Sequence, residues 1–159
     1  MIKYQPIKDK RSSYLSLFLL IGGLVIFMLS GSFTISPFII QLIAIALIVL
    51  SIQIMQRYVL SDFTYIIDDK DGGESILNVI RTQGQKNVTV CSVSLSECIY
   101  AGASDKFDRK LNNSFDYRQN VFEDNKFAIV YLDGADNIMI KLELDDYTRD
   151  CVVQRINSK

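Results

Sequence analysis

The sequence contains no histidine and no tryptophan, and it has only two prolines and three cysteines. Histidine is the commonest general base and the commonest protein metal ligand, so its absence excludes Ser-His and Cys-His nucleophile systems. Walker-type loops, the Gly-x-Ser-x-Gly elbow and the dinucleotide-binding fingerprint are missing as well. We therefore expect no catalytic residue, no cofactor site and no metal site, and we predict that the protein is not an enzyme.

Charge is absent from the run between Ser12 and Gln56, which holds no Asp, Glu, Lys or Arg. A helix rises about 1.5 Å per residue and the hydrocarbon core of a bilayer is about 30 Å thick, so one crossing needs roughly 20 apolar residues. The run is too long for one crossing and predicts two, at about residues 14–32 and 37–56. Gly31 suits a helix end, and Ser36 and Pro37 suit the next helix start. Residues 12–56 thus predict a two-helix transmembrane hairpin.

Two other interpretations of this run explain less of it. A cleaved signal peptide would account for the first apolar segment, but the second segment would still anchor the protein. A buried hairpin of a soluble protein would show polar residues at helical spacing, whereas the strong polar side chains here are Gln41 and Gln53.

The flanking charges predict the orientation of the hairpin. Lys3, Lys8, Lys10 and Arg11 precede the first segment in a basic N-terminus (residues 1–11), and Arg57 follows the second. The connecting turn has no basic residue, so the positive-inside rule places both termini in the cytoplasm. The same five cations would lie near lipid head groups. We expect an integral protein of the inner or plasma membrane.

Three residues inside the predicted crossings are candidates for helix–helix contact. Gly22 and Gly23 would let a neighbouring helix approach closely, and Gln41 could donate a hydrogen bond to another helix. Ionisable residues are absent from both segments. This argues against a proton relay, a voltage sensor or an ion path built by one copy of the hairpin.

The remaining residues, 57–159, have the length of one domain and carry 13 basic and 17 acidic residues. A mildly acidic domain is not a polybasic reader of lipid, and we expect no nucleic-acid partner. Runs of β-branched and aromatic residues predict strands at 58–67, 75–81, 87–94, 97–101, 115–122, 126–132 and 137–144. The last two flank Asp133–Asp136 and predict a hairpin.

The pattern changes to a helical period at residues 145–157. Tyr147, Cys151, Val152 and Ile156 would share one face, and this short helix should dock on the sheet.

The remaining reactive side chains have simpler explanations than catalysis. The acidic turn at Asp68–Glu74 lacks the ligand spacing of an EF-hand, so we interpret it as a surface hairpin turn. Cys91, Cys98 and Cys151 are an odd number of thiols in a reducing compartment, and we expect buried or half-buried thiols rather than disulfides or metal ligands.

This order of elements, with Arg57–Ser61 entering the first strand and Val93–Ile99 in the middle, resembles bacterial membrane proteins in which a two-helix hairpin precedes a pleckstrin-homology-like (PH-like) domain. The resemblance implies a mainly β cytoplasmic domain, a PH-like barrel or sandwich of about seven strands with a C-terminal helix. It also implies an adaptor or assembly module without shared catalytic residues. A different α+β sheet or another small β-barrel is the alternative, because residues 102–113 predict no clear element.

These features together predict a membrane-anchored, non-enzymatic interaction or assembly module. Its partners would be the lipid bilayer and either another protein or further copies of itself. One alternative is a subunit of a transport or channel complex, with Gln41 as the residue to examine. A less favoured alternative is a membrane-proximal enzyme that uses carboxylates, namely Asp62, Asp68, Asp69 or Asp71.

Overall fold

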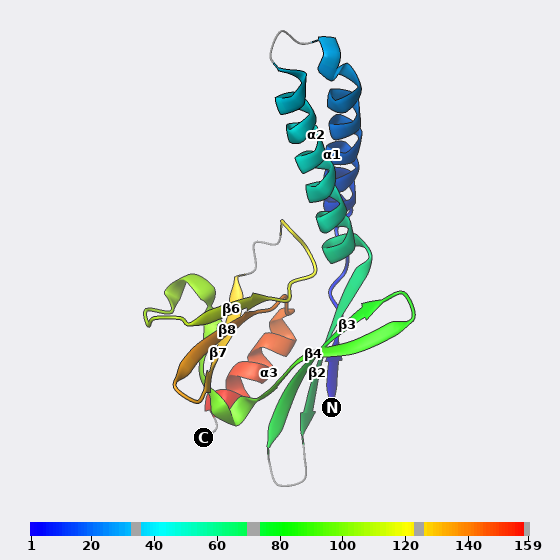
Figure 1. Ribbon diagram of the computed structural model, residues 1–159. Helices are drawn as coiled ribbons and strands as arrows, with labels where there is room; N and C mark the ends of the chain where they lie inside the picture. The colour runs from blue at the N-terminus through cyan, green and yellow to red at the C-terminus, as the bar shows by residue number, and fades with distance from the viewer. Residues whose placement is uncertain (33–35, 70–73, 123–125, 158–159) are drawn as a thin grey trace. The chain divides into compact units, whose positions relative to one another are not determined.

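A computed structural model describes residues 1–32, 36–69, 74–122 and 126–157 (Figure 1). Their contacts form two compact units, which we treat separately. One unit, the helical hairpin, comprises Lys8–Ser61 and Asn120–Phe122. The other, the β domain, comprises Met1–Ile7, Asp62–Gln119 and the described residues from Lys126 onward.

The helical hairpin contains the two predicted helices, side by side and antiparallel (Figure 1). Helix α1 spans Lys10–Leu29 and continues into a 3₁₀ turn, η1 (Ser30–Ser32). Helix α2 spans Pro37–Ile54, with its proline in the first turn as expected. The Asp9 side chain caps α1 by accepting a hydrogen bond from the backbone N–H of Arg11 at 3.0 Å. The predicted turn includes residues 33–35, which lie outside the described residues.

The end of the second helix corrects the prediction of a strand at 58–67. Residues Met55–Val59 form a π-helical turn, η2, that extends α2, and strand β2 (Ser61–Asp69) begins only after it. The Ser61 hydroxyl donates to the carbonyl of Gln56 at 2.7 Å and fixes the change from helix to strand. The β-branched and aromatic composition of 58–60 was therefore overridden by continuation of the helix.

The first sheet of the β domain has the strand order β1-β2-β3-β4, with β3 at Ser75–Gln83 and β4 at Lys86–Ser94. Strand β1, Ile2–Tyr4, precedes the hairpin in the sequence and pairs antiparallel with β2, with Lys3 opposite Ile66. The sequence pattern predicts only a basic N-terminal segment at residues 1–11. Three residues carry too little pattern to predict a strand, and β1 becomes visible only through its pairing.

The second sheet has the order β5-β7-β8-β6. Its strands are β5 (Cys98–Ala103), β6 (Asn113–Asp116), β7 (Phe127–Asp133) and β8 (Asp136–Lys141), with short 3₁₀ turns η3 (Leu95–Glu97) and η4 (Ser104–Lys106) before and after β5. Strand β6 runs parallel to β8. The described residues thus form eight strands, one more than the roughly seven expected.

The predicted strand at 115–122 is wrong beyond Asp116, where β6 ends. After Asp116 the chain no longer pairs with a strand and is held by hydrogen bonds that involve side chains. The buried Gln119 accepts a hydrogen bond from the backbone N–H of Phe63 on β2 through its Oε1, at 2.8 Å. Its own backbone N–H donates to the buried Glu143 carboxylate at 3.0 Å.

Two tight hairpins join neighbouring strands. The β7–β8 hairpin predicted around Asp133–Asp136 is confirmed. In this turn and in the β3–β4 turn, a glycine with positive φ is the first loop residue: Gly134 at 63° and Gly84 at 60°. Two-residue hairpins of this kind favour glycine at that position. The acidic turn predicted at 68–74 includes residues 70–73, which lie outside the described residues.

Helix α3, Asp146–Asn157, packs on a core to which both sheets contribute. The buried core side chains from these elements are Phe63, Tyr65, Ile67, Leu77, Val79, Val93, Leu95, Cys98, Phe127, Ile129, Ile140, Leu142, Leu144, Val152 and Ile156. The buried face of α3 follows Thr148, Val152 and Ile156, not Tyr147, which is 67% exposed. The predicted face is therefore wrong at Tyr147, because an aromatic residue was expected to be buried and its side chain instead faces solvent.

Candidate functional site

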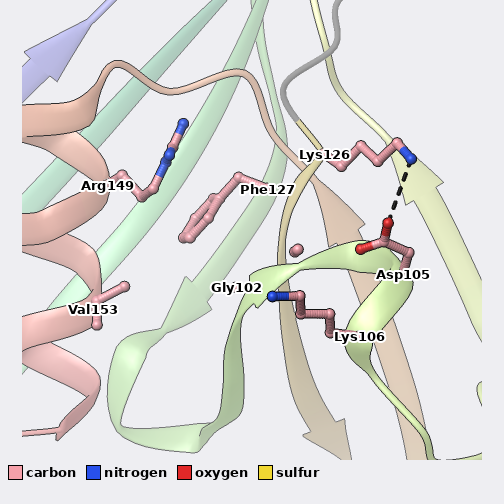
Figure 2. A pocket seen from close by; sticks show the side chains of 8 residues that line it. Gly102, Asp105, Lys106, Lys126, Phe127, Arg149 and Val153 are labelled. Carbon is pink, nitrogen blue, oxygen red and sulfur yellow. Dashed lines mark hydrogen bonds and ion pairs between the residues drawn. The ribbon is translucent and has the colours of Figure 1, made fainter.

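An open pocket in the β domain lies beside the end of β5, the η4 turn, the start of β7 and one side of α3 (Figure 2). Its volume is about 560 Å³. The lining residues are Gly102, Ala103, Asp105, Lys106, Lys126, Phe127, Arg149 and Val153. The size is within the range of small-molecule sites, roughly 300–1,000 Å³.

The rim of the pocket carries more positive than negative charge. Lys106, Lys126 and Arg149 contribute cations, and Asp105 is the one carboxylate among the described lining residues. Lys126 Nζ lies 3.4 Å from Asp105 Oδ2, with both side chains more than half exposed. An exposed pair of this length contributes at most about 1 kcal/mol and can rearrange readily.

Arg149 is the most constrained of these cations. Its Cζ atom lies 5.6 Å from the centre of the Phe127 ring, an arrangement that favours a fixed guanidinium plane. Its Nη1 lies 3.5 Å from Asp146 Oδ1, a carboxylate whose side chain is 94% exposed. The Nε atom is buried and has no hydrogen-bond partner among the described residues. Arg149 therefore holds a positioned guanidinium whose donor capacity is not saturated.

The floor of the pocket beside these charged side chains consists of apolar side chains and backbone atoms. Phe127 and Val153 supply apolar carbon, and Gly102 and Ala103 present little side chain. The Tyr100 hydroxyl donates to the Ala103 carbonyl at 2.7 Å, and a Cβ at Gly102 would come within 2.7 Å of that hydroxyl oxygen. A glycine at 102 thus allows Tyr100 to hold the end of β5 that forms one wall.

The three residues predicted to make helix–helix contacts have different surroundings in the hairpin. A Cβ at Gly23 would lie 2.8 Å from Ile48 Cγ1 and 3.1 Å from the Ala44 carbonyl, so α2 approaches closely here. A Cβ at Gly22 would meet nothing within 4 Å among the described residues. Gln41 Nε2 donates to Ser30 Oγ at 3.2 Å, which links α2 to η1.

Serines form a second set of helix contacts, at positions that are not among the predicted contact residues. The buried Ser51 hydroxyl on α2 donates to the Ser16 carbonyl on α1 at 2.6 Å. Ser16, Gly23 and Ser30 are all buried and recur every seven residues, as do Ala44 and Ser51 on α2. Seven residues are close to two helical turns, so this spacing would have predicted the contact face.

The basic residues assigned to topology take part in local contacts. Lys8 Nζ donates to the Val59 carbonyl at 2.7 Å, so the segments before α1 and after α2 meet at this end of the hairpin. Arg11 pairs with Asp9 at 3.5 Å, and the Arg57 guanidinium lies 5.0 Å from the centre of the Tyr58 ring. Lys10 begins α1, and Lys3 lies in β1 of the other unit.

The carboxylates and thiols that could carry chemistry are not brought together. Among the described residues, no group of three or more Cys, Asp or Glu side chains is arranged to hold a metal ion. The three cysteines are free thiols: Cys98 is buried, and Cys91 and Cys151 are half-buried. Burial raises the pKa of the Cys91 thiol, which disfavours the reactive thiolate. Of the four candidate acids, Asp71 lies outside the described residues, and Asp69 forms a two-bond ion pair with Arg155 at 2.9 Å.

Residues 6–159 match the family described as Bacterial PH-like domain (DUF6106). The chain belongs to this family. The match covers nearly the whole chain, including both apolar helices, and it confirms the resemblance drawn from the order of elements. Neither the curated proteins nor the solved structures gave a match.

In this PH-like protein, the charged pocket has no signature in the sequence. Lys106, Lys126 and Arg149 are each separated by about twenty residues: Lys106 ends η4, Lys126 immediately precedes β7, and Arg149 lies on α3. Each is an ordinary surface cation in its own segment, so no local pattern links them. Their convergence depends on the pairing of β5 with β7 and on the docking of α3.

Proposed function

We propose that the protein is a membrane-anchored, non-enzymatic interaction or assembly module that presents its PH-like domain at the cytoplasmic face. Both hairpin helices are long and apolar enough to cross a membrane. Core helices of soluble proteins are also long and apolar, but they are mostly buried. In each hairpin helix, only 17% of the apolar 18-residue stretch is buried inside the structure. Large side chains such as Phe18 and Phe38, which are 75% and 67% exposed, suit contact with lipid.

The observation that carries the proposal is the pairing of β1 with β2. Strand β1 precedes α1 in the chain and β2 follows α2, and the two form one sheet. If α1 crosses a bilayer, α2 must return the chain to the same side for this pairing to exist. The pairing thus supports two crossings, with the N-terminus and the β domain on one side.

The basic residues Lys3, Lys8, Lys10, Arg11 and Arg57 all flank the ends of the hairpin that lead to this sheet. Under the positive-inside rule these ends belong to the cytoplasmic side. This distribution supports an integral protein of the inner or plasma membrane with both termini in the cytoplasm.

The surface of the β domain supports a role in interaction. Its exposed large apolar side chains include Val88, Ile99, Phe115, Leu132 and Tyr147. These would suit contact with a second protein or with another copy of the chain. A non-enzymatic role is supported by the absence of histidine from the sequence. A pore-lining role for Gln41 has less support, because its amide donates to Ser30 within the hairpin.

Site-specific photo-crosslinking in native membranes tests this function. A photoreactive residue would replace Tyr147 or Val88 on the β domain and, in separate variants, Phe18 or Phe38 on the hairpin. We expect a discrete protein adduct from at least one β-domain position. Adducts from hairpin positions alone, together with ion or solute flux in reconstituted vesicles, would favour a transport subunit. Monomer and lipid adducts at all four positions would contradict an interaction module.

A further inference from the structure

We propose that the pocket between η4, the start of β7 and α3 binds an organic phosphate, with Arg149 as its principal ligand and Lys106 and Lys126 as supporting cations. This binding activity goes beyond the anchoring function. It depends only on the β domain and stands whether or not the hairpin crosses a membrane.

The charge of the pocket selects an anion. The lining contains three cations and one carboxylate, and that carboxylate lies 3.4 Å from Lys126 Nζ in an exposed pair. This excess is local, since the domain as a whole is mildly acidic. Positive charge concentrated in a hollow of an acidic domain raises the local concentration of anions there.

Arg149 supplies the geometry that a phosphate requires. A guanidinium presents a planar fork of donors that matches phosphate oxygens two at a time. Contact with the Phe127 ring holds this fork in place, and the pairing with Asp146 is long and exposed. Little side-chain entropy would be lost when the ligand binds, because the guanidinium is already positioned. Figure 2 shows Arg149 on the α3 side of Phe127, and Lys106 and Lys126 on the η4 side.

The size and floor of the pocket indicate that the phosphate carries an organic group. A volume of about 560 Å³ is much larger than a bare phosphate ion needs. The Phe127 ring, Val153 and Ala103 offer apolar surface next to the cations. An apolar or flat group attached to the phosphate would cover this surface, and its burial would add to affinity.

A phosphate monoester could come from a soluble metabolite or from a lipid head group, and calorimetry can separate these sources. The full chain in uncharged detergent micelles would be titrated with adenosine 5′-monophosphate, with adenosine as the phosphate-free control. A second series would use short-chain phosphatidic acid, with phosphatidylcholine as its control. Each series would compare wild type with Arg149→Gln, Lys106→Gln and Arg109→Gln. Arg109 is an exposed arginine outside the pocket, so its substitution makes the same charge change.

We expect saturable binding of at least one monoester. Arg149→Gln should raise its Kd roughly 10- to 100-fold, as expected for the loss of charge-assisted hydrogen bonds. Lys106→Gln should raise it by a smaller factor, and Arg109→Gln should leave it within about twofold. Binding of the soluble monoester alone, or of the lipid alone, would identify the source.

Two results would overturn the proposal. One is the absence of saturable binding by either monoester, and the other is equal weakening by Arg149→Gln and Arg109→Gln. Unfolding curves would show whether Arg149→Gln stays folded. If it does not, Arg149→Lys replaces it in the binding measurements. The lysine variant keeps the charge and loses the fork, so it should bind more weakly than wild type but retain salt dependence.

Discussion

The two adjacent glycines of α1 give a matched test of how the hairpin packs. Gly23→Ala places a Cβ 2.8 Å from Ile48 Cγ1 and 3.1 Å from the Ala44 carbonyl. Gly22→Ala places the same atom where nothing lies within 4 Å among the described residues. The two variants have the same composition and differ only in the helix face that receives the methyl group.

The expected difference follows from overpacking. Favourable contact between carbon atoms occurs at about 3.5–4.0 Å, so a methyl at Gly23 must push α2 away or force Ile48 to another rotamer. Such overpacking costs typically about 1–3 kcal/mol. Both variants gain helix propensity of up to about 1 kcal/mol by losing a glycine, so this gain cancels in the comparison. We expect Gly23→Ala to be less stable than Gly22→Ala by about 1–3 kcal/mol.

Unfolding in mixed micelles measures this difference. The full chain in mild detergent would be titrated with sodium dodecyl sulfate while its helical circular dichroism is recorded, and the midpoints of the variants compared. If Gly22→Ala and Gly23→Ala unfold within about 0.5 kcal/mol of each other, close packing of α2 at Gly23 is wrong.

Three further changes test individual contacts by the same unfolding assay. Ser51→Ala removes the interhelical hydrogen bond to the Ser16 carbonyl and should destabilise the hairpin by roughly 0.5–1.5 kcal/mol, and no loss would refute the contact. Arg155→Gln should destabilise the β domain by about 1 kcal/mol at neutral pH, a value reduced for solvent exposure. Because hydrogen bonds from Arg155 hold the pKa of Asp69 well below its usual value of about 4, this stabilisation exists above pH 4 and disappears as pH falls; a deficit that stays constant into acid would refute it. Gln119→Leu removes the buried hydrogen bond from the Phe63 backbone N–H on β2 to Gln119 Oε1 and should cost about 1–3 kcal/mol, whereas a neutral result would contradict that bond.

The parts of the fold that the sequence predicted correctly have strong local patterns. The apolar helices, the β7–β8 hairpin and the C-terminal helix each show a clear period or turn signal within one segment. The errors occur where tertiary contacts decide. Strand β1 exists because β2 offers it an edge, and the chain after Asp116 leaves the sheet because Gln119 bonds to β2 and to Glu143.

The candidate site was less predictable than the fold, for a related physical reason. A charged pocket built from η4, β7 and α3 has no local spacing, so it is visible only once the strands pair and the helix docks. The helix contact face was predictable in principle. Its signal is the seven-residue recurrence of Ser16, Gly23 and Ser30.

The most direct test of membrane anchoring is the accessibility of two single cysteines. In a chain whose native cysteines are replaced by serine, Ser32→Cys would report on the exposed turn end of the hairpin and Arg109→Cys on the exposed surface of the β domain. A membrane-impermeant maleimide would be applied to intact bacterial spheroplasts and to lysed ones. We predict that Ser32→Cys reacts in both samples and Arg109→Cys only after lysis. Labelling of Arg109→Cys in intact spheroplasts, or protection of Ser32→Cys until lysis, would contradict a hairpin that crosses the membrane with its β domain in the cytoplasm.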